Sequence, residues 1–407
     1  MTLGSRIKTL RKQKKLTLEQ LAGSKLTKGM LSLIENDKAK PSLESLEHIA
    51  KKLEIELNEL LQEKSISELR EELQQVESYY LKKEYDKVIN YIKADKEWPL
   101  YFESGRIFEL YGLSLYHNED DKWERYLNAA DQIYMELSHF DDSANLTIKL
   151  VKINLNSRKY ERAYHLLLNK QTVFKEMNAK IDTMNEIAFN YYKISLLFAL
   201  GRYDEASNQL EVSFAESRQK GLFYKIDDLY RLACFYSMMI GNFDEMRAYL
   251  KKLESYSIFA ESKEIKGFIY VIQAHYYNHY EKDHEAAISL IDKFKTLFKS
   301  DQSSGWKTYY VMEKGKALYH LKQYENALEH LLLFKEIPEW VHPFDLSIMY
   351  EIYAYIANCY VSLNQRDLAY KYAEKAFSGV YTLPSTPYKQ SIKKTFDYIK
   401  DYLREEQ

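Results

Sequence analysis

Apolar residues recur at helical spacing along this chain, and long stretches contain no helix-breaking residue. Leu3, Ile7 and Leu10, for example, give the first segment an apolar inner face and a cationic outer face. The 407 residues include only 12 Gly and 6 Pro, which excludes most sheet-rich designs. The sequence therefore predicts an all-α protein, and its length predicts at least two folding units.

Three short helices are expected near the N-terminus. Thr17 stands at an N-cap position before Leu18–Ala22, and Gln20 completes a capping-box pattern with it. Gly23 and Ser24 interrupt the chain, after which Thr27 caps a further helix over 28–35. Two short helices joined by a tight turn and flanked by basic residues are typical of a helix-turn-helix, whose second helix enters the major groove of DNA.

The charge distribution supports contact with DNA at this end alone. Residues 1–40 hold ten Lys or Arg against three acidic residues, a net charge of +7, whereas the whole chain carries −2. The remaining residues therefore carry −9, and phosphate attracts the first segment while it repels most of the rest.

The strings LTLEQLA (16–22) and IENDKAKPSLESLEHIAKKL (34–53) resemble the Xre/Cro-type helix-turn-helix. The resemblance implies a five-helix DNA-binding head over residues 1–62 that reads a double-stranded, palindromic operator. Base-reading positions would be Thr27, Lys28, Gly29 and Ser32, and phosphate contacts would be Arg11, Lys12, Lys38 and Lys40. The alternative for Lys28 and Lys38 is an ordinary solvated face.

A local pattern recurs through the rest of the chain: a polar turn, an anchor residue that is usually aromatic, two residues that are mostly charged or polar, and a small or apolar residue. The anchors are Tyr85, Trp123, Tyr160, Tyr203, Phe243, His284, Tyr324 and, weakly, Arg366. Successive anchors are 38, 37, 43, 40, 41, 40 and 42 residues apart. This near-constant period predicts repeated helix–turn–helix units.

These units resemble tetratricopeptide repeats, with a period of about forty instead of thirty-four residues. The resemblance implies a right-handed superhelix of eight to nine repeats over 81–407, preceded by a linker helix over 63–80, and a concave surface that binds an extended peptide. Polar and aromatic residues of the first helices are the predicted peptide-binding set: Asn145, Lys152, Asn190, Tyr191, Asp228, Arg231, Tyr276, Tyr309, Lys316 and Asn358. For each of them, a solvated face or a pair within the repeats is the alternative.

A Cro-type head joined to such repeats resembles the RRNPP family of Gram-positive quorum-sensing regulators, and its length is nearer to the NprR type than to the shorter PlcR and Rgg types. The family implies a cytoplasmic homodimer or tetramer that binds a short signalling peptide and thereby changes its contact with DNA. A second possibility is a Rap-like protein that binds a response regulator of the sporulation phosphorelay, for which Gln74 and Gln75 are candidate residues.

Enzyme and membrane functions have little support. His275 and His279 have the i, i+4 spacing of zinc ligands but no evident third ligand, so neither a metal nor a cofactor is expected. No phosphate-binding Gly loop or nucleophile elbow is present. Cys234 and Cys359 are expected to be buried, reduced residues. No signal peptide is recognisable and no apolar run approaches eighteen residues, so a cytoplasmic protein without a membrane partner is expected.

Overall fold

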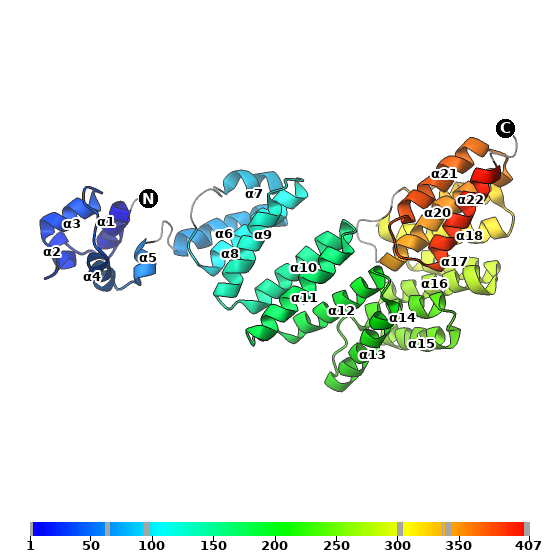
Figure 1. The fold of residues 1–407 in the computed structure, drawn as a ribbon, viewed down its shortest axis with the longest axis horizontal. Coiled ribbons are helices and arrows are strands. Elements are labelled where there is room, and N and C mark those ends of the chain that lie inside the picture. The colour runs from blue at the N-terminus through cyan, green and yellow to red at the C-terminus, as the bar shows by residue number, and fades with distance from the viewer. Residues whose placement is uncertain are drawn as a thin grey trace. The chain divides into compact units, whose positions relative to one another are not determined.

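The computed structural model describes residues 3–61, 66–92, 98–298, 304–335, 337 and 343–402. Every regular element within these ranges is a helix, which confirms the all-α prediction (Figure 1). The chain divides into two compact units, Met1–Leu146 and Thr147–Gln407, and the boundary falls inside α10 (Phe140–Asn156). None of the helices in the described ranges is long and apolar enough to cross a membrane.

The head contains the five predicted helices. They are α1 (Leu3–Gln13), α2 (Leu18–Ala22), α3 (Lys28–Glu35), α4 (Leu43–Leu53) and α5 (Leu57–Leu61). Ile7, Leu21, Leu31, Ile49 and Leu53 have no exposed surface and form the centre of its core. Burial of each such side chain contributes roughly 1.5–3 kcal/mol, so a head of this size depends on few residues.

The turns of the head have the chemistry that the sequence indicates. The Gln20 amide hydrogen is donated to Thr17 Oγ1 at 3.1 Å, and Thr17 N donates to Gln20 Oε1 at 2.7 Å, so the capping box before α2 is complete. α1 and α3 approach closely at Gly4, where a Cβ atom would lie 2.1 Å from the carbonyl oxygen of Ile34. Only glycine fits there without movement of the backbone.

Paired helices make up the rest of the described chain. The pairs are α6 (Ile66–Leu81) with α7 (Tyr85–Tyr91), α8 (Phe102–His117) with α9 (Trp123–Glu136), α10 with α11 (Tyr160–Glu176), α12 (Thr183–Ala199) with α13 (Tyr203–Lys220), α14 (Ile226–Met239) with α15 (Phe243–Phe259), α16 (Lys263–Tyr276) with α17 (His284–Leu297), α18 (Ser304–His320) with α19 (Tyr324–Leu331), and α20 (Pro343–Ser362) with α21 (Arg366–Val380). A π-helical turn (Tyr277–Glu281) extends α16, and α22 (Pro387–Tyr402) packs on the last pair.

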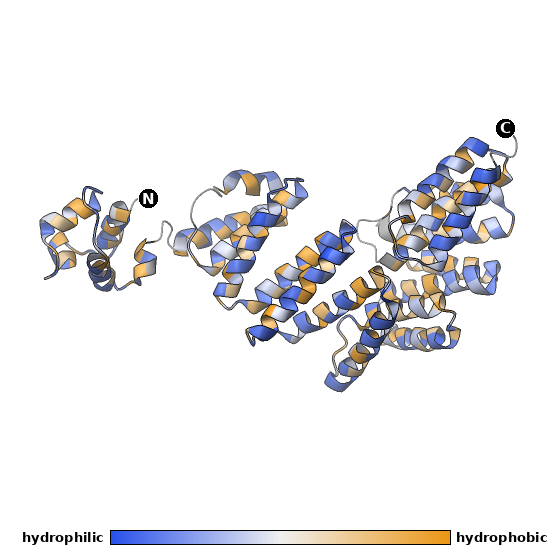
Figure 2. Ribbon diagram, viewed as in Figure 1, coloured by the Kyte–Doolittle hydropathy of each residue, from blue (hydrophilic) through white to orange (hydrophobic). Residues whose placement is uncertain are grey.

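Each of the eight anchor residues is the first residue of the second helix of its pair. The residue three positions later is buried in every pair, from Val88 in α7 to Ala369 in α21. Hydrophobic and hydrophilic residues alternate around these helices (Figure 2), as expected where one side of a helix packs on its neighbours. The recurring sequence pattern therefore marks the entry to the second helix and its first contact with the core.

The turns within the pairs use a left-handed residue that is seldom glycine. Two positions before the anchor the backbone has positive φ in seven pairs, at Lys83, Arg158, Gly201, Gly241, Lys282, Lys322 and Asn364. In the second pair Glu119 takes this conformation four positions before its anchor. Glycine and asparagine adopt it at low cost, whereas other residues lose roughly 1 kcal/mol, which the packing of the pairs must offset.

The segment predicted as a linker helix is packed as the first helix of the first pair. Leu69 and Val76 of α6 are fully buried in one cluster with Val88 of α7 and Ile107 of α8. Its role in joining the head to the repeats stays a prediction.

The last helices of the second unit contact its middle helices. Phe198 of α12 packs against Phe344 of α20 with 4.7 Å between ring centroids. Arg158, in the turn between α10 and α11, donates hydrogen bonds to the hydroxyl of Tyr350 at 2.7 Å and to the carbonyl of Gly379 at 2.9 Å. First helices that are distant in sequence therefore face one another inside this unit, which brings their polar side chains together.

Candidate functional site

The four residues predicted to read bases lie at or near the N-terminal end of α3. Thr27 precedes the helix in an extended conformation, and its Oγ1 accepts a hydrogen bond from Met30 N at 3.1 Å. Thr27, Lys28 and Gly29 are exposed and Ser32 is half-buried. The cap thus fixes the direction of α3, and these side chains lie where a nucleic acid could reach them; their contacts with bases stay a prediction.

Basic side chains around α3 are accessible. Lys12, Lys38 and Lys40 are exposed. Lys28 Nζ lies 2.9 Å from Glu19 Oε1 of α2, and these side chains are 61% and 71% exposed. Such an exposed pair contributes little to stability, so Lys28 can exchange Glu19 for an acceptor on DNA.

The prediction that Arg11 contacts a phosphate needs correction. Its Nε and Nη2 atoms lie 2.6 and 2.9 Å from the two carboxylate oxygens of Glu35, and its Nη1 donates to the carbonyl of Leu16 at 2.9 Å. The Glu35 side chain is buried, at 3% exposure, and the Arg11 side chain is mostly covered, at 12%. Arg11 therefore links α1 to α3 through an ion pair. The number of basic residues in a segment does not show whether a given arginine is paired inside the protein or exposed on its surface.

Two apolar residues on the exposed face of α3 were missed by the sequence analysis. Met30 and Leu33 are each 45% exposed. Leu33 follows Gly29 by four residues and so lies beside it on the same face, opposite the buried Leu31 and Ile34. The sequence did contain a signal for Leu33, because an apolar residue outside the buried stripe of a helix is free to contact another molecule.

Inside the second unit, four of the residues predicted to bind peptide converge. Arg231 Nη1 of α14 lies 2.8 Å from Asp345 Oδ2 of α20, and both side chains are buried. Burial lowers the pKa of Arg231, but the charges of Asp345 and Asp228 outweigh this and raise it. Tyr191 of α12 and Tyr309 of α18 lie near the same guanidinium and contribute, to a smaller extent, to its raised pKa. The predicted residues Tyr191, Asp228, Arg231 and Tyr309 thus form one cluster, while the sequence analysis missed Asp345.

Lys316 does not offer a free cation, contrary to the sequence-based expectation. It is fully buried, with Nζ 2.8 Å from Glu351 Oε2 and 3.3 Å from Glu313 Oε1. Burial lowers the pKa of Lys316, but the two carboxylates outweigh burial and raise it. Lys316 is therefore a charged residue with carboxylate partners inside the protein.

The remaining predicted residues are more dispersed. Lys152 of α10 lies 5.8 Å from the ring centroid of Tyr192, and burial together with the nearby Lys225 lowers its pKa. Tyr276 is buried and its hydroxyl bonds to Arg247 and Glu281. Asn358 is half-buried on α20, and Asn145 is exposed on the part of α10 that belongs to the first unit.

Hydrogen bonds within the protein occupy both ring nitrogens of His275, the first of the two histidines with zinc-like spacing. His275 Nδ1 lies 3.0 Å from Glu313 Oε1, and its Nε2 lies 3.0 Å from the hydroxyl of Tyr388. The His279 ring stacks on His275 with 5.2 Å between centroids. Among the described residues no group of three or more His, Cys, Asp or Glu side chains is arranged to hold a metal ion.

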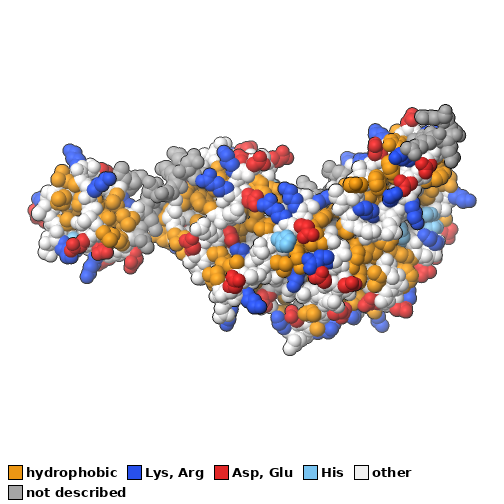
Figure 3. Space-filling model, viewed as in Figure 1, with side chains coloured by type: hydrophobic (Ala, Val, Ile, Leu, Met, Phe, Trp, Pro, Cys, Tyr) orange, Lys and Arg blue, Asp and Glu red, His pale blue; other side chains and the backbone are white. Residues whose placement is uncertain are grey.

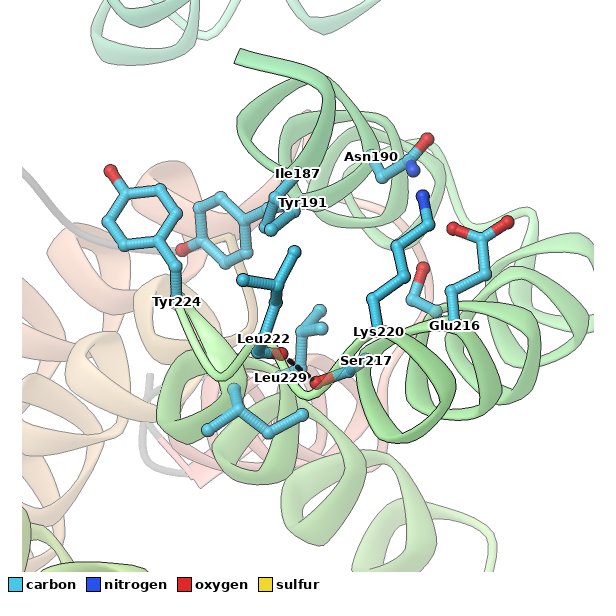
Figure 4. A pocket seen from close by; sticks show the side chains of 11 residues that line it. Ile187, Asn190, Tyr191, Glu216, Ser217, Lys220, Leu222, Tyr224 and Leu229 are labelled. Carbon is cyan, nitrogen blue, oxygen red and sulfur yellow. Dashed lines mark hydrogen bonds between the residues drawn. The ribbon is translucent and has the colours of Figure 1, made fainter. Parts of the chain in front are cut away.

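A pocket that is open to solvent lies between α12, α13 and the start of α14 (Figure 4). The predicted residues Asn190 and Tyr191 line it. Its other lining residues were not expected from the sequence: Ile187, Ser213, Glu216, Ser217, Lys220, Leu222, Tyr224, Ile226 and Leu229. Several of these belong to the second helix α13 or to the link between α13 and α14, whereas the predicted peptide-binding residues all lie on first helices.

The fold and these sites define a helix-turn-helix head followed by tetratricopeptide-like helix pairs. Residues 4–66 match the family described as "Helix-turn-helix domain". The chain is 49% identical over 51 residues to the immunity repressor protein of Bacillus phage phi105, a match that spans 12% of this chain and 35% of the repressor. The similarity to this relative therefore covers only about a third of its length and lies within a small part of this chain.

Two solved structures are similar to this chain at low sequence identity. A tetratricopeptide repeat protein from Parabacteroides merdae is similar with a TM-score of 0.46 and 11% identity, over 73% of this chain and 99% of that one. Bacillus thuringiensis PlcR, in complex with the peptide PapR7 and DNA, is similar with a TM-score of 0.24 and 16% identity, over 91% of this chain and 98% of that one.

Proposed function

We propose that this chain is a cytoplasmic transcriptional regulator of the RRNPP type, in which α3 reads operator DNA and the repeats bind a short signalling peptide. The observation that carries the proposal is the combination of two surfaces in one chain. One is the exposed face of α3 in a helix-turn-helix, and the other is a pocket beside a buried polar cluster formed by first helices.

Binding to DNA needs two heads. A single head covers little surface and binds weakly, whereas two heads in a dimer bind two half-sites at a fixed spacing. On the face seen in Figure 3, basic and acidic side chains are interspersed over the repeats, in contrast to the excess of basic residues in the first forty positions. This supports DNA contact through the heads and leaves the repeats for dimerisation and peptide binding.

A peptide would meet the half-buried Asn190 and Tyr191 first, because Arg231 already has a carboxylate partner. A ligand that carries a carboxylate would compete with Asp345 for Arg231 and so disturb the contact between α14 and α20. The dimer would then present its heads at a different separation, and its affinity for a fixed operator would change.

The test is a gel shift with the promoter region upstream of the protein's own gene, with and without each short secreted peptide encoded next to it. The expected result is a shifted complex whose affinity changes with one peptide. Lys28→Ala should weaken the complex at every peptide concentration, whereas Asn190→Ala should alter only the response to peptide. A complex insensitive to all candidate peptides and to Asn190→Ala would contradict the proposal.

A further inference from the structure

The pocket between α12 and α14 has an apolar wall. Ile187 and Tyr191 of α12 face Leu222 and Tyr224 of the following link across the hollow, and Leu229 of α14 lies beneath (Figure 4). A wall of aliphatic and aromatic side chains stabilises an apolar ligand group by excluding water from it.

One lining residue offers a hydrogen bond that the protein does not use. Ser213 of α13 is 8% exposed, and its Oγ has no hydrogen-bond partner among the described residues. Some helical serines bond to the carbonyl four positions earlier, as Ser114 does to Leu110 and Ser255 does to Lys251. Ser104 and Ser195 also lack a hydrogen-bond partner within the described part of the chain, but unlike Ser213 they do not line this pocket. An unpartnered buried hydroxyl costs roughly 1–3 kcal/mol, a cost that a ligand group bonded to it would remove.

The mouth of the pocket carries charges of both signs. Asn190, Glu216 and Lys220 lie on one side of the hollow, away from the two tyrosines (Figure 4). Lys220 Nζ lies 3.9 Å from Glu186 Oε2, and both side chains are about half exposed. Glu186, Glu216 and Lys220 together carry a net charge of −1, so the entrance disfavours an anionic group.

We propose that this pocket anchors one uncharged side chain of the peptide, apolar along its length and with a terminal hydroxyl that bonds to Ser213. A tyrosine side chain has this chemistry. The inference rests on the proposed function for the source of the ligand, but the pocket has its own readout.

The test uses blocked single residues as probes: the N-acetyl amides of tyrosine, phenylalanine and glutamate. The full-length protein is labelled at the methyl groups of Ile and Leu, so that NMR follows Ile187, Leu222 and Leu229 during titration. The expected result is saturable shifts of these methyls with the tyrosine and phenylalanine probes and none with the glutamate probe. Tyrosine should bind about fivefold more tightly, as one net hydrogen bond allows.

Two variants isolate the role of Ser213. Ser213→Ala should keep both aromatic probes bound and abolish the preference for tyrosine, whereas Ser213→Leu should fill the pocket and abolish binding of both. Ser255→Ala, which removes a helical hydroxyl outside the pocket, is the matched control and should change nothing. Equal affinity of the wild-type protein for the two aromatic probes, or shifts that persist in Ser213→Leu, would overturn the inference.

Failure of this inference is distinguishable from failure of the proposed function. If a peptide changes operator affinity equally in the wild type and in Ser213→Leu, the protein is still a peptide-responsive regulator. The pocket then has no part in its response to the peptide. If the protein binds the probes but binds neither operator nor peptide, the inference about the pocket stands and the proposed regulatory function is wrong.

Discussion

Arg231 of α14 and Asp345 of α20 form a buried ion pair, with 2.8 Å between Nη1 and Oδ2, across 114 positions of sequence. The guanidinium also lies 5.5 Å from the ring centroid of Phe268 on α16. The ion pair and the ring contact of Arg231 thus link three first helices, α14, α16 and α20. Removing the pair should therefore lower the stability of the second unit.

Removing one partner of this pair should be more damaging than removing both. Arg231→Met leaves a buried carboxylate without its cation and should lower the free energy of unfolding by about 3–5 kcal/mol. The double variant Arg231→Met/Asp345→Leu should be more stable than the sum of the single changes implies. Urea unfolding of the four proteins in a double-mutant cycle measures this, and strictly additive losses would argue against coupling.

Arg11 and Lys38 should respond differently to substitution although both are basic residues of the head. Arg11→Ala leaves Glu35 buried without its partner and should lower the melting temperature of the head. Lys38→Ala should leave stability unchanged and reduce the salt dependence of DNA binding, with the slope of log K against log salt smaller by about 0.9.

Thermal unfolding and anisotropy titrations at several salt concentrations separate these two effects. Lys12→Ala serves as a second exposed control and should behave as Lys38→Ala does. A stable Arg11→Ala protein with a reduced salt slope would return Arg11 to the phosphate contacts.

Two glycines of the head should differ in their tolerance of alanine. At Gly29 a Cβ atom meets nothing within 4 Å, so Gly29→Ala should stabilise α3 by about 0.5–1 kcal/mol. At Gly4 the same atom would lie 2.1 Å from the Ile34 carbonyl oxygen, so Gly4→Ala should destabilise the head. Calorimetry of the two variants gives the comparison, and similar melting temperatures would contradict the close approach of α1 and α3.

Leu33 should read a thymine methyl group. Apolar contact with that methyl is one of the few ways in which an aliphatic side chain can recognise a base. On a duplex selected from a random library, replacing the contacted thymine by uracil should weaken wild-type binding about fourfold, the effect of one buried methyl group. Leu33→Ala should bind both duplexes equally, and a wild-type protein indifferent to the methyl group would exclude this role.

Acid should destabilise the second unit through two half-buried histidines, His279 and His320. Burial, followed by the charges of His275 and Lys316, lowers the pKa of His279 to about 2, and burial lowers the pKa of His320 to about 4. The unfolded chain binds protons below about pH 6.5 whereas the folded chain does not, so stability is complete above that pH and falls below it. At pH 5 each histidine should lower the free energy of unfolding by up to about 2 kcal/mol.

Unfolding in urea at pH 7.5 and pH 5 measures this loss. His279→Gln and His320→Gln should each show a smaller difference between the two pH values than the wild type. His165, whose side chain is 68% exposed, provides the control His165→Gln, which should match the wild type. Identical pH dependence in all four proteins would refute the assignment.

Local order was predictable because short-range chemistry specifies it. Thr17, Gln20 and Thr27 cap the helices of the head as their spacing indicates, and the eight anchors mark the starts of eight second helices. Each of these features depends on residues within four positions of one another, so the sequence by itself determined the helix caps of the head and the starts of the second helices.

The tertiary structure decided which charges are free. Arg11 and Lys316 look like surface cations in the sequence, yet each meets a carboxylate that lies 24 and 35 positions away, respectively. Ser213 and Asn190 line one pocket because α12 and α13 turn back on each other. Such relationships arise from the packing of helices distant in sequence, where burial makes an unpaired charge costly, and helical periodicity carries no information about the partner.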